Sequence, residues 1–325
     1  MTTVGTLREN GSMFVTGGAG FIGSHLVDRL VQGDCTVTVF DSLAGGANWI
    51  QPYIERGRVR FVQANLLDRK RLEEAMRGAS VVWHLGGNTD IPAGFQYTDL
   101  DVKNAILATH SVLESMRLTG VAKLLFPSTG AVYGEAQVVP TPESYGPLLP
   151  LSLYAAGKLA CEALISAYCS MFGLRARILR LGNVVGARMG HGVIYDFIEK
   201  LSRNPQALEI LGDGRGEKNY FLVEECIDGM VFVLENTFSD DDPRCDILNL
   251  GTDASTPVMT IARIVIEEMG LKNVRFRYTG GALGWPGDQP RVCLDVTKLK
   301  NWGWTARHPS DHAVRVAARR YLGKG

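Results

Sequence analysis

The stretch MFVTGGAGFIGSHL, residues 13–26, decides how the rest of this 325-residue chain is interpreted. A short apolar run leads into a glycine-rich turn, which leads into apolar positions at helical spacing. Gly17 permits a tight turn out of a strand, Gly20 lets a pyrophosphate approach the backbone, and Gly23 lets the helix pack against the sheet. Free N–H groups at the helix start favour negative charge. The stretch predicts a dinucleotide site.

The overall composition excludes several classes of protein. The chain has 46% hydrophobic residues and 34 basic against 34 acidic side chains, which gives no reason to expect nucleic acid or an anionic membrane as partner. No run of about 18 apolar residues predicts a membrane span. Residues 1–11 lack the apolar centre of a signal peptide, so we expect a flexible tail there and a cytoplasmic protein.

The cysteines and histidines show no metal-ligand spacing, and we expect no metal. None of the six cysteines forms a CxxC pair, so buried free thiols are expected rather than a disulfide framework. His84 ends an apolar strand-like run, where a structural role is favoured.

A carboxylate follows the second predicted strand. Residues 36–40 (TVTVF) are β-formers, and Asp41 comes next, 18 residues after Gly23. In that place a carboxylate accepts hydrogen bonds from ribose hydroxyls and repels a 2′-phosphate. No arginine follows directly, so NAD is favoured over NADP. Alone, Asp41 would be an ordinary loop residue; the glycine turn gives it this role.

Strands and helices then alternate along the chain, which predicts an α/β fold with a doubly wound parallel sheet of the Rossmann type. Ligands bind such sheets at the carboxyl ends of the strands, where Gly17, Asp41, Leu85 and Ser128 are expected to converge. The further expected strands are 59–63, 80–85 and 122–126, and the expected helices are 21–31, one from about 68, and 98–118.

From about residue 182 the alternation loosens, and loops rich in glycine and proline separate shorter helices near 224–236, 258–269 and 310–320. We therefore expect an NAD-binding domain over 12–182. Residues 183–325 should form mainly a smaller mixed α/β lobe for the substrate, interleaved with the last strands of the first domain.

Tyr154 and Lys158 lie four residues apart, on one face of a predicted helix. A nearby ammonium and a nicotinamide ring would lower the pKa of the phenol, which could then take a proton from a sugar hydroxyl. A YxxxK pattern alone is weak. It gains weight from Ser128 and Thr129, two hydroxyls at the end of the strand over 122–126, one of which could hydrogen-bond the reacting oxygen.

These motifs together resemble the extended short-chain dehydrogenase/reductase family, and within it the NAD-dependent nucleotide-sugar epimerases and dehydratases. The resemblance rests on TGGAGFIGSH, Asp41, HLGGN, PSTGAVYG, Tyr154 with Lys158, and RLGNVVG (180–186), in this order. The later runs HGVIYDF (191–197), LGDG (211–214) and GWPGD (284–288) look most like microbial UDP-galactose 4-epimerases.

The resemblance implies roles for individual residues and for two helices. The catalytic set would be Thr129, Tyr154 and Lys158. Helices near 98–118 and 153–172 would form a homodimer interface. NAD would be held by Gly17, Gly20, Phe21, Ile22, Asp41, Asn65, Leu66, Leu85 and Lys158, and a UDP-sugar by Asn88, Thr129, Tyr154, Asn183, Val193, Lys218, Asp288 and Val292.

Three positions depart from the family pattern. Asn65 stands where an aspartate usually contacts adenine. Lys218 replaces an arginine and so loses the bidentate fork. Trp285 stands in place of another arginine and either stacks on a base or packs the lobe. Diphosphate binding would then lean on Lys218 and backbone amides, with Arg188, Arg215 or Arg291 as further candidates.

The residues after Thr129 distinguish the reactions of the family. By resemblance, 4,6-dehydratases carry an Asp-Glu pair there and uronate decarboxylases a glutamate, whereas this chain has Gly130 and Ala131. The sequence therefore predicts a 4-epimerase, with a UDP-hexose as substrate. Val292, where a tyrosine narrows the pocket in related epimerases, leaves room for an N-acetyl group, and Asp90 disfavours a uronate.

Two alternatives remain open. One is a dehydratase or a UDP-uronate-processing enzyme of the same family, whose acid would come from Asp90 or Glu135. The other is a catalytically silent NAD-binding regulator, against which the complete set of Thr129, Tyr154 and Lys158 argues.

Overall fold

The computed structural model describes residues 11–43, 46, 48–281 and 283–324, so the tail expected over 1–11 lies outside the described residues except for Gly11. The chain forms two compact units, each built from three stretches. Unit 1 comprises Met1–Ser128, Leu153–Leu179 and Ile227–Leu248, and unit 2 comprises Thr129–Ser152, Arg180–Cys226 and Asn249–Gly325. The interleaving is thus more extensive than a division at residue 182, because 129–152 group with unit 2 and 227–248 with unit 1.

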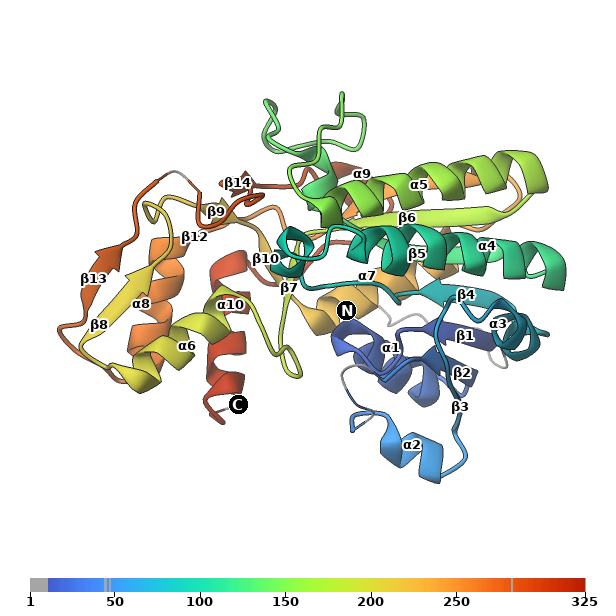
Figure 1. The fold of residues 1–325 in the computed structure, drawn as a ribbon, viewed down its shortest axis with the longest axis horizontal. Coiled ribbons are helices and arrows are strands. Elements are labelled where there is room, and N and C mark those ends of the chain that lie inside the picture. Colours follow the sequence, from blue (N-terminus) through green and yellow to red (C-terminus); the bar gives the residue numbers. More distant parts are fainter. Residues whose placement is uncertain (1–10, 44–45, 47, 282, 325) are drawn as a thin grey trace. The chain divides into compact units, whose positions relative to one another are not determined.

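Unit 1 is organised around a parallel sheet of seven strands in the order β11-β6-β5-β4-β1-β2-β3 (Figure 1). Strand β1 pairs with β2 on one side and β4 on the other, so Thr16 lies opposite both Phe40 and His84. The strand ends that carry the predicted site therefore lie at one edge of the sheet. The strands are β1 Ser12–Thr16, β2 Thr36–Asp41, β3 Val59–Gln63, β4 Val81–His84, β5 Lys123–Thr129, β6 Arg175–Leu181 and β11 Cys245–Leu250.

Helices of unit 1 bury their apolar faces against this sheet, around Phe14, Leu113, Phe126 and Ile165. The helix expected over 98–118 is a π-helical turn, η2 (Val102–Leu107), continued by α4 (Ala108–Thr119). Figure 1 shows α4 running beside α5 (Leu153–Phe172), and the two are in contact. The remaining helices are α1 Phe21–Gln32, α2 Gln51–Glu55, α3 Arg69–Met76 and the short 3-10 helix η1 Pro92–Phe95.

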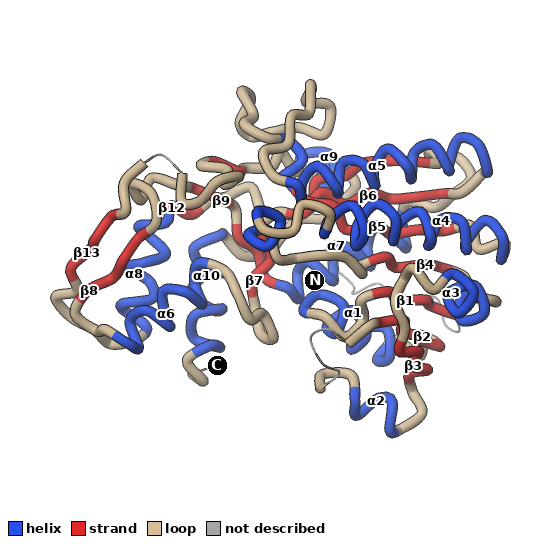
Figure 2. Tube along the Cα trace, in the orientation of Figure 1, coloured by secondary structure: helices blue, strands red, loops and turns tan. Residues whose placement is uncertain are grey.

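Unit 2 contains short strands and several helices rather than one large sheet (Figure 2). Its core packs helices α6, α8 and α10 around residues such as Phe197, Ile261 and Val314. The helices expected near 258–269 and 310–320 are α8 and α10, and the one near 224–236 is α7, which crosses from unit 2 into unit 1. The helices are α6 Val193–Arg203, α7 Val223–Asn236, α8 Val258–Glu268, α9 Thr297–Asn301, α10 Ser310–Tyr321 and the 3-10 helix η3 Gly130–Tyr133.

The sheets of unit 2 have two or three strands each: β12-β9-β14, β10-β7 and β13-β8. Their strands are β7 Asn183–Val185, β8 Ala207–Ile210, β9 Glu217–Lys218, β10 Tyr220–Leu222, β12 Thr256–Pro257, β13 Arg275–Tyr278 and β14 Arg291–Val292.

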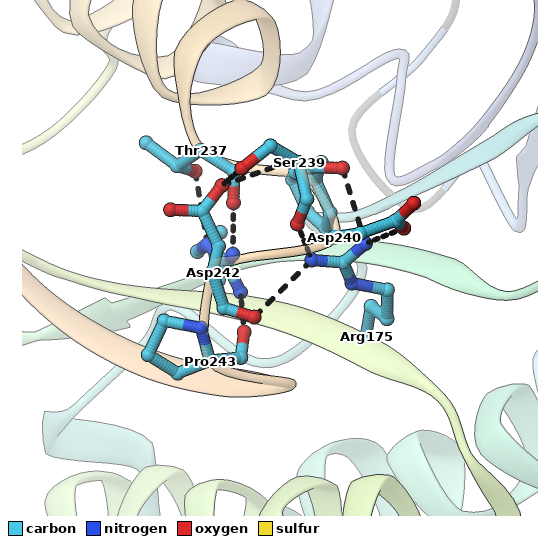
Figure 3. Close-up of polar contacts among 8 residues, drawn as sticks. Arg175, Thr237, Ser239, Asp240, Asp242 and Pro243 are labelled. Atoms are coloured by element: carbon cyan, nitrogen blue, oxygen red, sulfur yellow. Dashed lines mark hydrogen bonds and ion pairs between the residues drawn. The ribbon is translucent and has the colours of Figure 1, made fainter.

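Two arginines of β6 explain why residues 227–248 belong to unit 1. Arg177 is fully buried, and its guanidinium donates to Thr237 Oγ1 at 2.9 Å and to the Pro243 carbonyl at 2.9 Å. Arg175 donates to the carbonyls of Phe238 and Ser239 (Figure 3). Carbonyls that follow α7 thus accept hydrogen bonds from two guanidinium groups that would otherwise be costly to bury.

Two further expectations can be compared with the structure. All six cysteines are free thiols, five of them buried and Cys245 half-buried. Among the residues that the structure describes, no helix combines the length and apolar character needed to cross a bilayer.

Candidate nucleotide and sugar site

The glycine turn has a backbone that larger residues would not fit. Gly17 has φ 69°, and a Cβ placed on it would lie 2.6 Å from the Gly86 nitrogen. A Cβ on Gly23 would lie 2.1 Å from the Gly17 carbonyl oxygen. The prediction that Gly23 packs against the sheet needs correction, because it packs against the turn itself. Gly18 faces the sheet, with its Cβ position 2.7 Å from Val39 Cγ1.

The start of α1 fits a pyrophosphate. Gly20 is the N-cap, and no acidic residue stands in the first turn, which Phe21 and Ile22 begin. A Cβ on Gly20 would approach only the Gly17 oxygen, at 3.3 Å, among the described atoms within 4 Å. The first amide that bonds back into the helix is that of Ser24. The N–H groups before it are available to an anion, as the helix dipole favours.

Asp41 ends β2 beside this turn. Its Oδ2 accepts from the Ala19 amide at 3.0 Å and its Oδ1 from the Leu43 amide at 2.8 Å. Each carboxylate oxygen has a second lone pair, so the fixed carboxylate can still accept from two ribose hydroxyls. The residues of the turn and of β2 therefore fit NAD.

The residues expected near adenine lie close to the turn. The Cβ position of Gly86, directly after Leu85, lies 2.9 Å from Leu66 Cδ1. A Cβ on Gly17 would clash with Gly86, so Gly17, Leu66 and Gly86 lie against one another and form one wall of the candidate site. Asn65 is exposed, and its Oδ1 accepts from the Leu67 amide at 2.9 Å, which leaves its NH₂ group for a base.

The two hydroxyls at the end of β5 have different partners. Ser128 is buried, and its Oγ donates to Glu162 Oε1 at 2.5 Å. Thr129 is half-buried, and its Oγ1 accepts from the Ala131 amide at 3.1 Å, so its own hydrogen can be donated elsewhere. Of the two candidates, Thr129 is the one whose geometry suits a reacting oxygen.

Tyr154 and Lys158 stand in the first turns of α5, as predicted. Tyr154 is half-buried. Lys158 is buried, and its Nζ donates to the Pro127 carbonyl at 2.8 Å and lies 4.6 Å from the centre of the Phe126 ring. Burial lowers the pKa of Lys158, while nearby negative groups oppose that change. Thr129 belongs to unit 2, and Tyr154 and Lys158 belong to unit 1.

His84 forms the centre of a buried hydrogen-bond chain, which confirms its structural role. Its Nδ1 lies 2.7 Å from Thr16 Oγ1 and its Nε2 lies 3.0 Å from Thr109 Oγ1. Thr109 donates to Cys161 Sγ, so it must accept from His84 Nε2–H. His84 Nδ1 then accepts from Thr16, which itself accepts from the Gly86 amide. Burial, with a contribution from Lys158, lowers the pKa of His84 to about 3.

Asn88 and Asp90, both considered for the sugar pocket, hold their own loop. Asn88 Nδ2 donates to the Asp90 carbonyl at 3.1 Å and to Asp101 Oδ1 at 3.0 Å, and Asn88 Oδ1 accepts from the Asp90 amide. Asp90 Oδ1 accepts from the Ala93 amide at the start of η1. The amide hydrogens of Asn88 are therefore already in use.

Three of the residues predicted to bind substrate lie together in unit 2. Lys218 Nζ pairs with Asp288 Oδ1 at 2.7 Å and lies 5.1 Å from the centre of the Trp285 ring. Val292 pairs with Lys218 between β14 and β9. The Val292 Cγ1 lies 3.3 Å from the Cβ position of Gly130. Trp285 thus contacts the cation that replaces the usual arginine, and 38% of its surface stays exposed.

Asn183 and Val193, which were also predicted to bind substrate, lie elsewhere in unit 2. Asn183 begins β7, with its backbone amide bonded to the Asn219 carbonyl at 2.9 Å. Val193 begins α6 directly after Gly192, which has φ 101°, and packs against the core of the unit.

The chain belongs to the NAD dependent epimerase/dehydratase family, whose sequence pattern matches residues 13–251. A putative UDP-glucose 4-epimerase of Methanocaldococcus jannaschii is 32% identical over 90% of this chain and 92% of its own. A crystal structure of a UDP-galactose 4-epimerase is 35% identical, with a TM-score of 0.84 over 96% of this chain and 99% of that chain.

Enzymes with other reactions are also similar to this chain. A dTDP-glucose 4,6-dehydratase from Streptomyces venezuelae, solved with NAD bound, is 25% identical, with a TM-score of 0.86 over 95% of this chain and 96% of that chain. The comparisons therefore define an NAD-dependent nucleotide-sugar enzyme, and the reaction has to be argued from the residues.

Sequence reasoning missed two buried carboxylates, Glu162 and Asp101. Glu162 stands four residues after Lys158 in the apolar run LACEALI (159–165), and an acidic residue there is a detectable signal. Asp101 precedes the π-helical turn and lies against Gly157, whose Cβ position is 3.2 Å from the Asp101 Cβ. No spacing rule connects Asp101 with α5.

Proposed function

We propose that the protein is a nucleotide-sugar 4-epimerase that acts on a UDP-hexose. Tyr154 would take the proton of the sugar 4-hydroxyl, Thr129 would hydrogen-bond the same oxygen, and Lys158 would hold the phenolate form through its charge. When bound, NAD would supply the acceptor for the hydride of C4 and the donor for its return to the opposite face of the sugar. Between these events the 4-keto sugar would rotate about its link to the diphosphate, and Tyr154 would give the proton back.

The end of β5 supports epimerisation over elimination. Gly130 and Ala131 follow Thr129 and carry no acid. The Cβ position of Gly130 lies 3.1 Å from Leu294 Cδ2 and 3.3 Å from Val292 Cγ1, so an acidic side chain there would require its neighbours to move. A 4,6-dehydratase must protonate a leaving hydroxyl at C6, whereas an epimerase needs only groups at C4.

The proposal extends to the grip on the nucleotide and to assembly. Lys218, held by Asp288, would face the diphosphate as a single point charge, with Asn183, Val193 and Val292 around the nucleotide sugar. Residues 12–182 would supply most of the NAD site. We further propose a cytoplasmic homodimer through α4 and α5, which present the exposed apolar side chains Leu118, Met171 and Phe172.

Incubation with UDP-, dTDP- and GDP-sugars, without added NAD, tests the proposal. Proton NMR should show inversion at C4 with at least one UDP-hexose or its N-acetyl derivative. No inversion with any sugar in the panel would refute the epimerase.

A dehydratase is the second candidate, because a solved dehydratase matches the fold with a TM-score of 0.86. Its acid would have to come from Asp90 or Glu135, and the Asp90 carboxylate instead caps η1. Mass spectrometry separates the two reactions, since dehydration loses one water and epimerisation preserves the mass.

A further inference from the structure

Two charged side chains of α5, one helical turn apart, hold consecutive residues of β5. Lys158 Nζ donates to the Pro127 carbonyl at 2.8 Å. Ser128 Oγ donates to Glu162 Oε1 at 2.5 Å. Residues four apart share one face of a helix, so Lys158 and Glu162 reach the same strand end. We call these four residues the α5–β5 clamp.

The α5–β5 clamp is buried, so the charge of the Glu162 carboxylate costs free energy on folding. Glu162 is 4% exposed and Ser128 is 3% exposed. A buried carboxylate requires partners for its negative charge, and the hydroxyl of Ser128 is one of them. The nearest basic group on the same face of α5 is the ammonium of Lys158, itself only 9% exposed.

Four titratable groups from three elements of unit 1 act electrostatically on Lys158 or are affected by it: His84 of β4, Asp101 before η2, and Cys161 and Glu162 of α5. Burial keeps His84 neutral, and burial raises the pKa of the Cys161 thiol, so neither supplies a negative charge at neutral pH. The opposing charges are the carboxylates of Glu162 and Asp101. Asp101 accepts from Asn88 through Oδ1, and Glu162 accepts from Ser128 and stands on the same helix as Lys158.

We propose that Glu162 is a positioning residue that supplies a buried negative charge one helical turn from Lys158 and, through Ser128, fixes the strand end from which Thr129 continues. Its effect on catalysis rests on the proposed function. Its effect on the charge of Lys158 does not, since that follows from the burial of both side chains and their spacing on α5.

Two matched variants separate the charge from the hydrogen bond. Glu162→Gln removes the charge and keeps an oxygen that can accept from Ser128. Ser128→Ala removes the hydrogen bond and keeps the charge. Thermal unfolding of both variants and of the wild type, between pH 7 and pH 10, compares the two effects without any substrate or cofactor.

The direction of the expected result follows from linkage. Burial lowers the pKa of Lys158 below its unfolded value, so the charged lysine opposes folding in full below the folded pKa, and this penalty declines as the pH rises from the folded to the unfolded pKa. Loss of the Glu162 charge should lower the pKa of Lys158 further and should enlarge the free-energy penalty of burying its ammonium at pH 7. The deficit in Tm of Glu162→Gln should therefore shrink towards pH 10, as the pH rises through the folded pKa of Lys158 in the two proteins. The deficit of Ser128→Ala should stay constant.

A deficit of Glu162→Gln that is constant from pH 7 to pH 10 would overturn the proposal. If this variant does not fold, the double variant Lys158→Met/Glu162→Gln removes both charges and should restore folding. Failure of the double variant to fold would also overturn it.

The effect of Glu162 on catalysis is measured separately, from the pH profile of kcat. In Glu162→Gln the alkaline limb of the pH profile of kcat should move about one unit lower, and in Ser128→Ala it should not move. Coincident limbs in the wild type and Glu162→Gln would contradict the catalytic role. An enzyme without epimerase activity would refute the proposed function and leave the unfolding experiment decisive for the charge.

Discussion

The two units place their candidate residues in different ways. In unit 1 the glycine turn, Asp41 and Gly86 follow strands of a seven-stranded sheet, and each is fixed by neighbouring backbone. In unit 2, Lys218 and Val292 stand on strands of two residues each, in a three-stranded sheet. The close backbone contacts of unit 1 tolerate little change in side-chain shape, whereas the short strands of unit 2 can be altered locally. We infer that unit 1 supplies the NAD site with Tyr154 and Lys158, and that unit 2 supplies Thr129 and the residues that choose the nucleotide sugar.

Tyr154→Phe should break the chemistry and leave binding intact. Loss of the proton acceptor should lower kcat by about 10³-fold or more, because general acid–base catalysis typically contributes factors of 10²–10⁴. NAD affinity, measured by isothermal titration, should change little. Turnover equal to that of the wild type would contradict the assignment of Tyr154.

Gly23→Ala should test the rigidity of unit 1. Its Cβ would lie 2.1 Å from the Gly17 carbonyl oxygen, so we expect destabilisation of more than about 3 kcal/mol, measured by urea unfolding. Gly20→Ala is the matched control, because among the described residues its Cβ would approach within 4 Å only the Gly17 oxygen, at 3.3 Å. It should retain stability and lose NAD affinity. Equal stabilities of the two variants would contradict the description of the turn.

Lys218→Ala should affect substrate binding more than chemistry. It removes the cation beside Trp285 and leaves the mostly buried Asp288 carboxylate without its partner, so we expect KM for the UDP-sugar to rise about 10–100-fold. Arg203→Ala is the control, since its side chain is 79% exposed and pairs with Glu199 within α6 at 3.1 Å. A similar rise in KM for both variants would show that the Lys218 site is not specific.

His84 should make folding weaker in acid. Its pKa is lowered to about 3 in the folded state, so below about pH 6.5 only the unfolded state binds the proton. This one group should reduce the free energy of unfolding by about 1 kcal/mol between pH 6.5 and pH 5.5. The measurement is the pH slope of unfolding for the wild type and for His84→Gln, which should lack this contribution. Nitrogen NMR should show the Nε2–H tautomer throughout.

Much of unit 1 could be predicted because its signals are local. The strand Val59–Gln63 has the bounds expected from its residues, Gly17 directly follows β1, and Asp41 is the last residue of β2. These features depend on residues close in sequence. Gly23 was predicted to pack against the sheet, but it packs against the glycine turn. This contact depends on the path of the backbone a few residues earlier.

The rest depends on contacts between distant residues. The grouping of 227–248 with unit 1 follows from Arg175 and Arg177, which bind carbonyls about 60 residues later. The difference between Ser128 and Thr129 follows from Glu162, 34 residues away. The roles assigned to Thr129, Tyr154, Lys158 and the substrate-binding residues remain predictions, and variants of each can test them.

The fate of deuterium at C4 tests the central claim most directly. Purified protein would be incubated with UDP-glucose that carries deuterium at C4, in ordinary water and without added NAD. The proposed mechanism predicts UDP-galactose of unchanged mass, with the deuterium still at C4, because the same hydride equivalent leaves and returns. A product that has lost water or carries hydrogen at C4 would contradict it.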